Sequence, residues 1–125
     1  MWAKTLIYLG ALLPLIWGIA HLFPTKSVIQ GYGDIGEDNK RIIAMEWINE
    51  GASLIFIGAL TATTTVIDPG AKVSIAVYLL SATFLVALAV ISLFTGFRIR
   101  FLPFRLCPII FISSALSIIT GWLLF

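Results

Sequence analysis

Hydrophobic residues along this chain fall into four long runs separated by shorter polar stretches. The runs cover about Thr5–Phe23, Ile42–Ile67, Val73–Phe97 and Leu106–Phe125. Each run approaches the roughly 20 apolar residues that an α-helix needs to cross the hydrocarbon core of a bilayer. The pattern predicts an all-α fold, a polytopic membrane four-helix bundle. We expect a single transmembrane domain over residues 1–125, with a long loop over residues 24–41.

The composition excludes an ordinary soluble domain. Hydrophobic residues make up 60% of the chain and charged residues only 11%, with a mean hydropathy of +1.07. Soluble domains average about 25% charged residues. The single cysteine excludes an intramolecular disulfide, and no nucleic-acid-binding motif accompanies the net charge of +2. We therefore expect the lipid bilayer as a partner and no nucleic acid.

The basic residues predict an orientation in the membrane. Six of the eight lysines and arginines lie in the first and third loops, and only Lys4 and Lys72 lie on the opposite side. Cytoplasmic loops of membrane proteins carry an excess of lysine and arginine. This asymmetry places loops 1 and 3 in the cytoplasm and both termini outside. Loop 1 also holds apolar residues between glycines, among them Tyr32, which favours a segment that folds back over the mouth of the bundle.

Two carboxylates in the second run carry most of the functional information. Glu46 and Glu50 are four residues apart, so they share one helical face, with Asn49 between them and Ser53 one turn further on. Ionisable groups within a membrane are costly and persist mainly where they face a bundle interior, pair, or move ions and protons. With an N-cap near Asp38, Glu46 is expected about two turns inside and Glu50 about three.

The end of the first run supplies a partner for these carboxylates. His21 shares a helical face with Trp17, and loop 1 brings that face to the same side of the membrane as the glutamates. We expect His21, Glu46 and Glu50 to converge within about one water molecule of each other. Such a trio can relay protons or bind a polar head group, but it has too few ligands for a metal site. The candidate ligand- and proton-binding residues are His21, Glu46, Asn49, Glu50, Trp17, Trp47, Ser53 and Tyr32.

A packing role for the same carboxylates stays open. One glutamate can be protonated and hydrogen-bonded across helices while the other extends towards Arg41. On the fourth run, Ser113, Ser117 and Gly121 recur at spacings of four. Small residues at that period allow close helix packing, within the bundle or between identical copies of the chain.

The second run resembles the second helix of DoxX-like small membrane proteins. After Glu46 the sequence continues as Glu50-Gly51-Ala52-Ser53-Leu54-Ile55-Phe56-Ile57-Gly58-Ala59-Leu60-Thr61, a glutamate followed by a glycine-rich apolar helix with a threonine-containing exit. The exit lacks the basic residue often found there, and the resemblance covers roughly residues 10–65. It implies a four-helix bundle and, as in some members, a link to quinone-dependent sulfur-compound oxidation or to membrane oxidoreductase assemblies. It further implies a quinone or small-ligand site with proton uptake from the cytoplasmic side.

Three function classes therefore remain. The first is an integral membrane subunit that binds a quinone or other small ligand, or relays protons, as an accessory to a redox system. The second is a structural or assembly subunit of a larger membrane complex, and the third is a small lipid- or sterol-modifying isomerase-like enzyme. The chain has no haem-ligand pair, CxxC motif or iron–sulfur spacing, so any redox partner must be another subunit or a diffusible quinone. Other membrane subunits or further copies of the chain are the expected protein partners.

Overall fold

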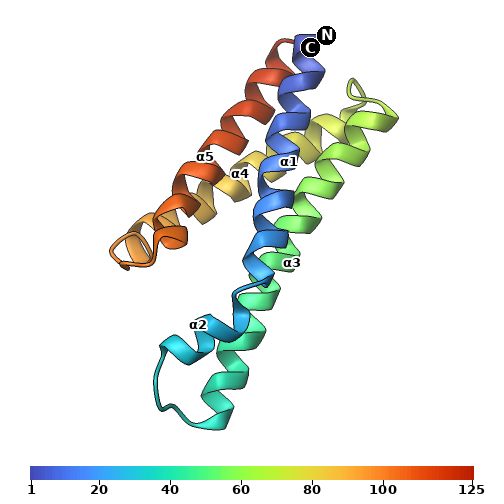
Figure 1. Cartoon of the computed structure of the whole chain (residues 1–125). Coiled ribbons are helices and arrows are strands. Elements are labelled where there is room, and N and C mark those ends of the chain that lie inside the picture. The colour runs from blue at the N-terminus through green and yellow to red at the C-terminus, as the bar shows by residue number, and fades with distance from the viewer.

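The computed structural model describes residues 1–125 as five α-helices with no strand (Figure 1). The helices are α1 (Trp2–Leu22), α2 (Thr25–Gly31), α3 (Glu37–Ile67), α4 (Lys72–Thr95) and α5 (Leu102–Leu123). All except α2 are long and apolar enough to cross a membrane. The prediction of an all-α, polytopic membrane bundle is confirmed, and the fold is that of an integral membrane protein.

The segment 24–41, expected to be a loop, is largely helical. It contains α2, and α3 already begins at Glu37, five residues before the expected start at Ile42. Glu37 and Asp38 occupy the first turn of α3, where negative charge is favourable, and Lys40 pairs with Glu37 at 2.7 Å. Gly36 is therefore the N-cap in place of Asp38. Hydropathy marks where a helix enters the bilayer, whereas polar residues can continue the same helix into water.

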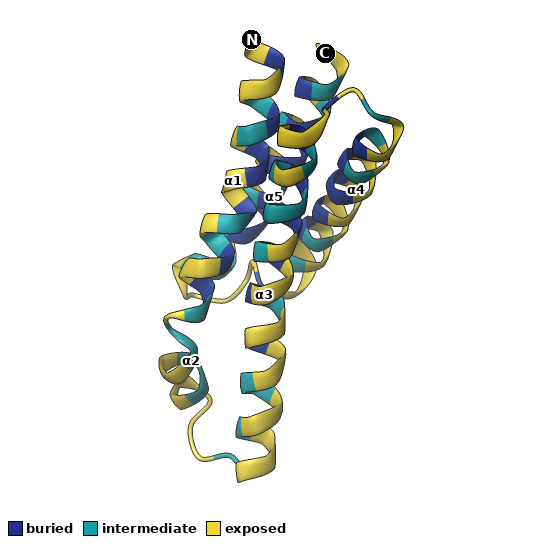
Figure 2. Cartoon of the chain, turned by 90° about the vertical axis from the view of Figure 1, so that its right-hand side faces the viewer, coloured by how far each residue is buried: buried dark blue, intermediate teal, exposed yellow.

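Helix α3 is longer than the bilayer is thick. Its 31 residues span about 46 Å, against a hydrocarbon core of about 30 Å. Counted back from Ile67, about 20 residues bring the membrane boundary close to Trp47. The first part of α3 and the whole of α2 therefore project beyond the other helices, and most of this projection is exposed (Figure 2). On this count from helix length, Glu46 falls at the boundary and Glu50 one turn inside it.

The four long helices are not equally close to one another. Helix α1 is central, packing along α3 on one side and α5 on the other, and α4 packs on α5. Both termini lie beside the α3–α4 turn, and we call this end of the bundle the turn end (Figure 1). The opposite end carries α2 and the link between α4 and α5, and we call it the open end. Towards the open end, α4 and α5 diverge from α3.

Small residues set the close helix contacts. A Cβ atom on Gly58 would lie 2.6 Å from the Cβ of Leu15, and one on Gly121 would lie 2.7 Å from the carbonyl oxygen of Ala3. Close backbone approach at small residues is typical of membrane helices, which gain little from burying apolar surface against each other. On α5 the buried serine is Ser114, whereas Ser113 is exposed. Gly121 packs against α1 of the same chain. The small residues Ser113, Ser117 and Gly121 are therefore not all available for packing between copies of the chain.

Hydroxyl groups join α3 to α4 near the turn end. The hydroxyls of Thr65 and Tyr78 are hydrogen-bonded at 2.9 Å, and Thr61 donates to Ser81 at 3.2 Å. Tyr78 and Thr61 are completely buried. Because α4 diverges from α3 beyond this region (Figure 1), these bonds mark the point from which the two helices separate.

Candidate functional site

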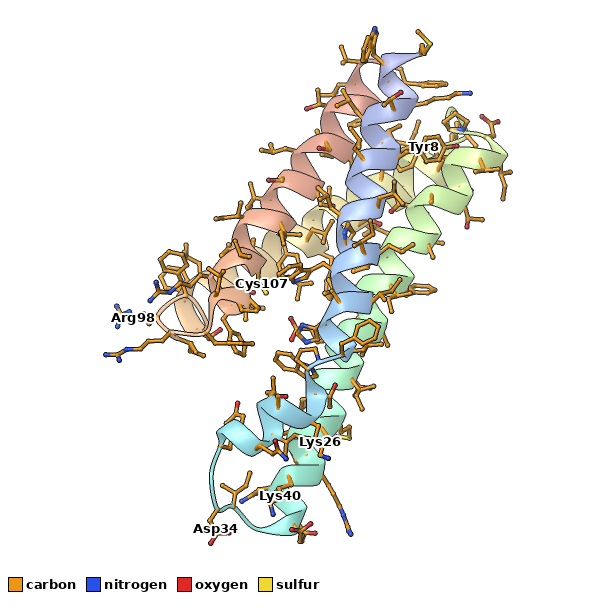
Figure 3. The ribbon with its side chains drawn as sticks, in the orientation of Figure 1. Tyr8, Lys26, Asp34, Lys40, Arg98 and Cys107 are labelled. Carbon is orange, nitrogen blue, oxygen red and sulfur yellow. The ribbon has the colours of Figure 1, made fainter.

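A cavity of about 330 Å³ lies at the open end, between α1 and α3 on one side and α4 and α5 on the other. We call it the chamber. His21, Trp47 and Glu50 form one wall, and residues of α4 and α5 including Ser92, Phe104 and Cys107 form the opposite wall. Cys107 lies on the part of α5 that precedes its close packing on α1 (Figure 3). The chamber exists because the two helix pairs diverge here.

His21 is held in position by Trp47. The two rings are stacked, with centroids 3.8 Å apart and an interplanar angle of 16°. The indole Nε1–H of Trp47 also donates to the backbone carbonyl oxygen of His21 at 2.7 Å. This bond satisfies a carbonyl at the end of α1, where the helix can no longer supply a donor. Trp47 therefore fixes both the backbone and the ring of His21.

Glu50 faces the histidine without closing a hydrogen bond to it. The His21 Nε2 and Glu50 Oε2 atoms are 3.5 Å apart, beyond the usual range for N–H···O bonds. The Nε2 atom is buried and has no hydrogen-bond partner, and the His21 side chain is only 6% exposed. A buried polar atom left unpaired costs about 1–3 kcal/mol. The pair therefore leaves hydrogen-bonding capacity that a bound group can use.

Aromatic rings cover the side of the chamber towards the link between α4 and α5. Phe104 meets Trp47 edge-on at 5.6 Å between centroids, and Phe101 meets Phe104 at 5.8 Å. Such arrangements match the electrostatics of aromatic pairs. Together with Trp47, Phe104 gives the chamber flat apolar surfaces beside the polar pair.

Two further hollows adjoin the chamber. The first, of about 460 Å³, runs along α3 and is lined by Glu46, Asn49, Ser53 and Tyr32, and it shares Glu50 with the chamber. We call it the α3 groove. The second, of about 420 Å³, lies between α2 and the link between α4 and α5. Phe104 lines all three hollows, so its ring lies between the chamber and the hollow beside α2, whereas Glu50 itself faces the α3 groove.

The structure brings together only part of the predicted set. His21, Trp47 and Glu50 share the chamber, but Glu46 does not line it and is exposed in the α3 groove. The expected trio is therefore a pair, because α1 ends at Leu22 beside Gly51 and Glu46 lies more than one turn beyond that point along α3. The other polar candidates on this face, Asn49 and Ser53, are also exposed in the α3 groove.

The remaining two candidates lie outside the chamber. Trp17 is half-buried, and its Nε1 atom is buried without a hydrogen-bond partner. Tyr32 forms the C-cap of α2 and is 57% exposed. Its segment packs beside the projecting part of α3, so it does not close over the end of the bundle.

Several lining residues escaped the sequence reasoning. Phe104 lies in the basic third loop and Cys107 near the start of the fourth apolar run, and neither position carries a signal for a site in the sequence. Ser92 and Thr95 lie three residues apart near the end of α4, a spacing that puts both on one face. That spacing was an available signal for a polar lining on α4.

No group of three or more histidine, cysteine, aspartate or glutamate side chains is placed to share a metal ion. Comparison with protein-family models, with curated proteins and with solved structures finds no match to this chain. The chemistry open to the site is hydrogen bonding by His21 and Glu50, proton exchange through the same groups, and packing of a flat apolar group against Trp47 and Phe104.

Proposed function

We propose that this chain is an integral membrane subunit that binds the head group of a quinone in the chamber, as an accessory to a redox system. The observation that carries the proposal is the buried, unpartnered Nε2 atom of His21 beside Glu50, in a cavity walled by aromatic rings. The resemblance of the second helix to DoxX-like proteins supports the same class of ligand.

A quinone head suits the chamber in shape and in hydrogen bonding. It is a flat ring that carries carbonyl oxygens, which accept hydrogen bonds from a histidine N–H or from a protonated carboxyl group. The reduced form carries hydroxyl groups, which donate to a carboxylate. His21 covers one face of Trp47, so Phe104 and the part of Trp47 that lines the chamber offer the apolar surface against which such a ring packs.

The site also supplies a path for protons. Reduction of a quinone to a quinol takes up two electrons and two protons. His21 and Glu50 can hand protons to the head group, and the exposed Glu46 lies one turn closer to water. The electrons must come from a partner subunit, because the chain has no set of residues for haem or iron–sulfur ligation.

The proposal includes an orientation. The open end carries six of the eight basic residues, which favours a cytoplasmic open end and outside termini. Protons for the site are then taken up from the cytoplasm. Other membrane subunits or a second copy of the chain are the proposed protein partners.

An isomerase-like enzyme is a second candidate, favoured by one observation. Trp47 and Phe104 lie beside a carboxylate, and aromatic faces stabilise cations such as those formed during double-bond migration in an apolar substrate. A structural subunit is less favoured, because the His21–Glu50 pair leaves a buried atom unsatisfied instead of tying two helices together.

The test compares ligand content with stability. Wild type, Glu50→Gln, His21→Phe and Glu46→Gln are purified in one detergent, their bound lipids are extracted, and quinone per protein is measured by liquid chromatography and mass spectrometry. Loss of a hydrogen bond to a charged group predicts about a tenfold lower quinone content for Glu50→Gln and His21→Phe. Glu46→Gln is the matched control and should retain its quinone. A cationic amphiphile added as a competitor tests the second candidate.

Two results would contradict the proposal. Equal quinone content in wild type and in Glu50→Gln would remove the head-group site. Unfolding of both chamber variants, with Glu46→Gln intact, would assign the pair to helix packing and favour the structural subunit.

A further inference from the structure

The α3 groove is open to the bilayer because α3 and α4 touch mainly near the turn end. The hydrogen bonds Thr61–Ser81 and Thr65–Tyr78 close that region, and no comparable bond joins the two helices nearer to the chamber. There, Asn49 and Ser53 of α3 face Phe84 of α4 across the groove. A molecule in the surrounding lipid can therefore reach Glu50 sideways.

The groove continues towards the middle of the membrane. Another hollow, of about 540 Å³, shares Asn49, Ser53 and Phe84 with the α3 groove. It extends the groove along α3 to Ile57. From Glu50 to Ile57 the path follows seven residues of α3, or about 10 Å. It starts about one turn inside the membrane boundary and runs inwards.

This direction is the one that a membrane lipid takes. A lipid of the leaflet at the open end has its head near the boundary and its tail towards the midplane. The chamber offers hydrogen-bonding groups at the head position, and Phe56, Ile57 and Phe84 offer apolar surface at the tail position. The polar Ser53 does not interrupt the path with an unsatisfied hydroxyl, because it donates to the backbone oxygen of Asn49 at 2.7 Å.

We propose that the path along Asn49, Ala52, Ser53 and Ile57, between α3 and α4, holds the long apolar tail of the ligand whose head occupies the chamber. The ligand is then a lipid, a quinone with a polyprenyl tail, which enters sideways from the bilayer. This inference rests on the proposed function and adds the class of ligand and its route. A tail gains little from leaving lipid for protein, since both are apolar, so the path matters as the exit that the tail must take while the head occupies the chamber.

The experiment blocks the path without touching the chamber. The intact chain is reconstituted in lipid nanodiscs, and quenching of tryptophan fluorescence is titrated with two probes that share a benzoquinone ring, one with a decaprenyl tail and one without a tail. Ala52→Phe places a ring in the path, and Ala87→Phe adds the same ring at an exposed position of α4 that lines none of these hollows.

We expect Ala52→Phe to weaken binding of the tailed probe by about tenfold and to leave the tail-less probe unchanged. Ala87→Phe should change neither. On wild type, a photoreactive group placed early in the tail should cross-link to residues 49–57 of α3 or to α4 near Phe84.

The outcomes separate this inference from the function on which it rests. If Ala52→Phe binds both probes like wild type, or if the tail cross-links elsewhere, the tail path is wrong while the head-group site stands. If neither probe binds wild type, or if Glu50→Gln binds both probes unchanged, the head-group site fails, and the tail path fails with it. Cross-linking on wild type decides the matter even if Ala52→Phe does not fold.

Discussion

The two ends of the bundle differ in how completely their buried polar side chains are hydrogen-bonded. Towards the turn end, the buried hydroxyls of Tyr78, Thr61 and Ser114 each have a hydrogen-bond partner on another helix. Nearer to the open end, the Nε2 atom of His21 and the Nε1 atom of Trp17 are buried without one. Unsatisfied buried groups in a native structure call for an explanation, such as a bound water or ion or a functional role. The turn end therefore ties the helices together through hydrogen bonds, and the unpaired atoms nearer to the open end support the binding site proposed there.

The largest effect is expected from overpacking the turn end. A side chain on Gly121 meets backbone atoms of α1, with the amide nitrogen of Ile7 at 2.9 Å, and backbone cannot easily move away. Gly121→Leu should therefore destabilise the chain by about 3 kcal/mol and lower its thermal midpoint in detergent. Gly31→Leu, at the end of α2 where nothing lies within 4 Å, is the control and should stay close to wild type. A Gly121→Leu variant as stable as wild type would contradict the close contact.

A smaller effect is expected from the hydroxyl pair that joins α3 to α4. A double-mutant cycle with Tyr78→Phe and Thr65→Val should give a coupling energy of about 0.6 kcal/mol, the average for such bonds in membrane helices. The same cycle with His21→Phe and Glu50→Gln should give almost none in ligand-free protein, because the pair is 3.5 Å apart. Both coupling energies are measured by unfolding in mixed micelles. Equal coupling energies for Tyr78–Thr65 and His21–Glu50 would contradict the difference between the two ends.

The smallest expected effect is on the access of a reagent to the Cys107 thiol, with no change in the stability of the protein. Cys107 is the single cysteine and lines the chamber, so its alkylation by a small maleimide reports on that space. We expect a quinone to slow the alkylation about threefold, as a bound head group excludes the reagent. Ser114→Cys in a Cys107→Ser background places a thiol in the fully packed region, and its slower reaction should not respond to quinone. An alkylation rate at Cys107 that is the same with and without quinone would argue against binding of quinone in the chamber.

Much of the fold is predictable because a membrane imposes strong constraints on sequence. Every backbone group must be paired inside the bilayer, so an apolar run of sufficient length can only be a helix. The limits of α3 are not predictable in this way, since Glu37 and Lys40 extend it in water, where hydropathy carries no signal.

The candidate site is predictable only in part. Spacing on one helix and the connection through loop 1 identified His21 and Glu50 as neighbours, and the structure places them 3.5 Å apart. The same spacing predicts Glu46 with them, but Glu46 lies beyond the point where α1 ends and therefore falls outside the chamber. Phe104 and Cys107 depend on how far α4 and α5 diverge from α3, which is a property of helix packing and not of any local pattern. The resemblance to DoxX-like proteins stays a prediction.

The extra length of α3 has an electrical consequence. Glu50 lies seventeen residues before Ile67, or about 25 Å along a helix that crosses about 30 Å of hydrocarbon. A proton that reaches Glu50 from the open end therefore crosses about one sixth of the membrane. Moving a charge across the whole thickness is worth about 2.3 kcal/mol per 100 mV, so this partial crossing is worth about 0.4 kcal/mol. Proton uptake at the chamber should consequently follow the acidity of the compartment at the open end and respond only weakly to the membrane potential.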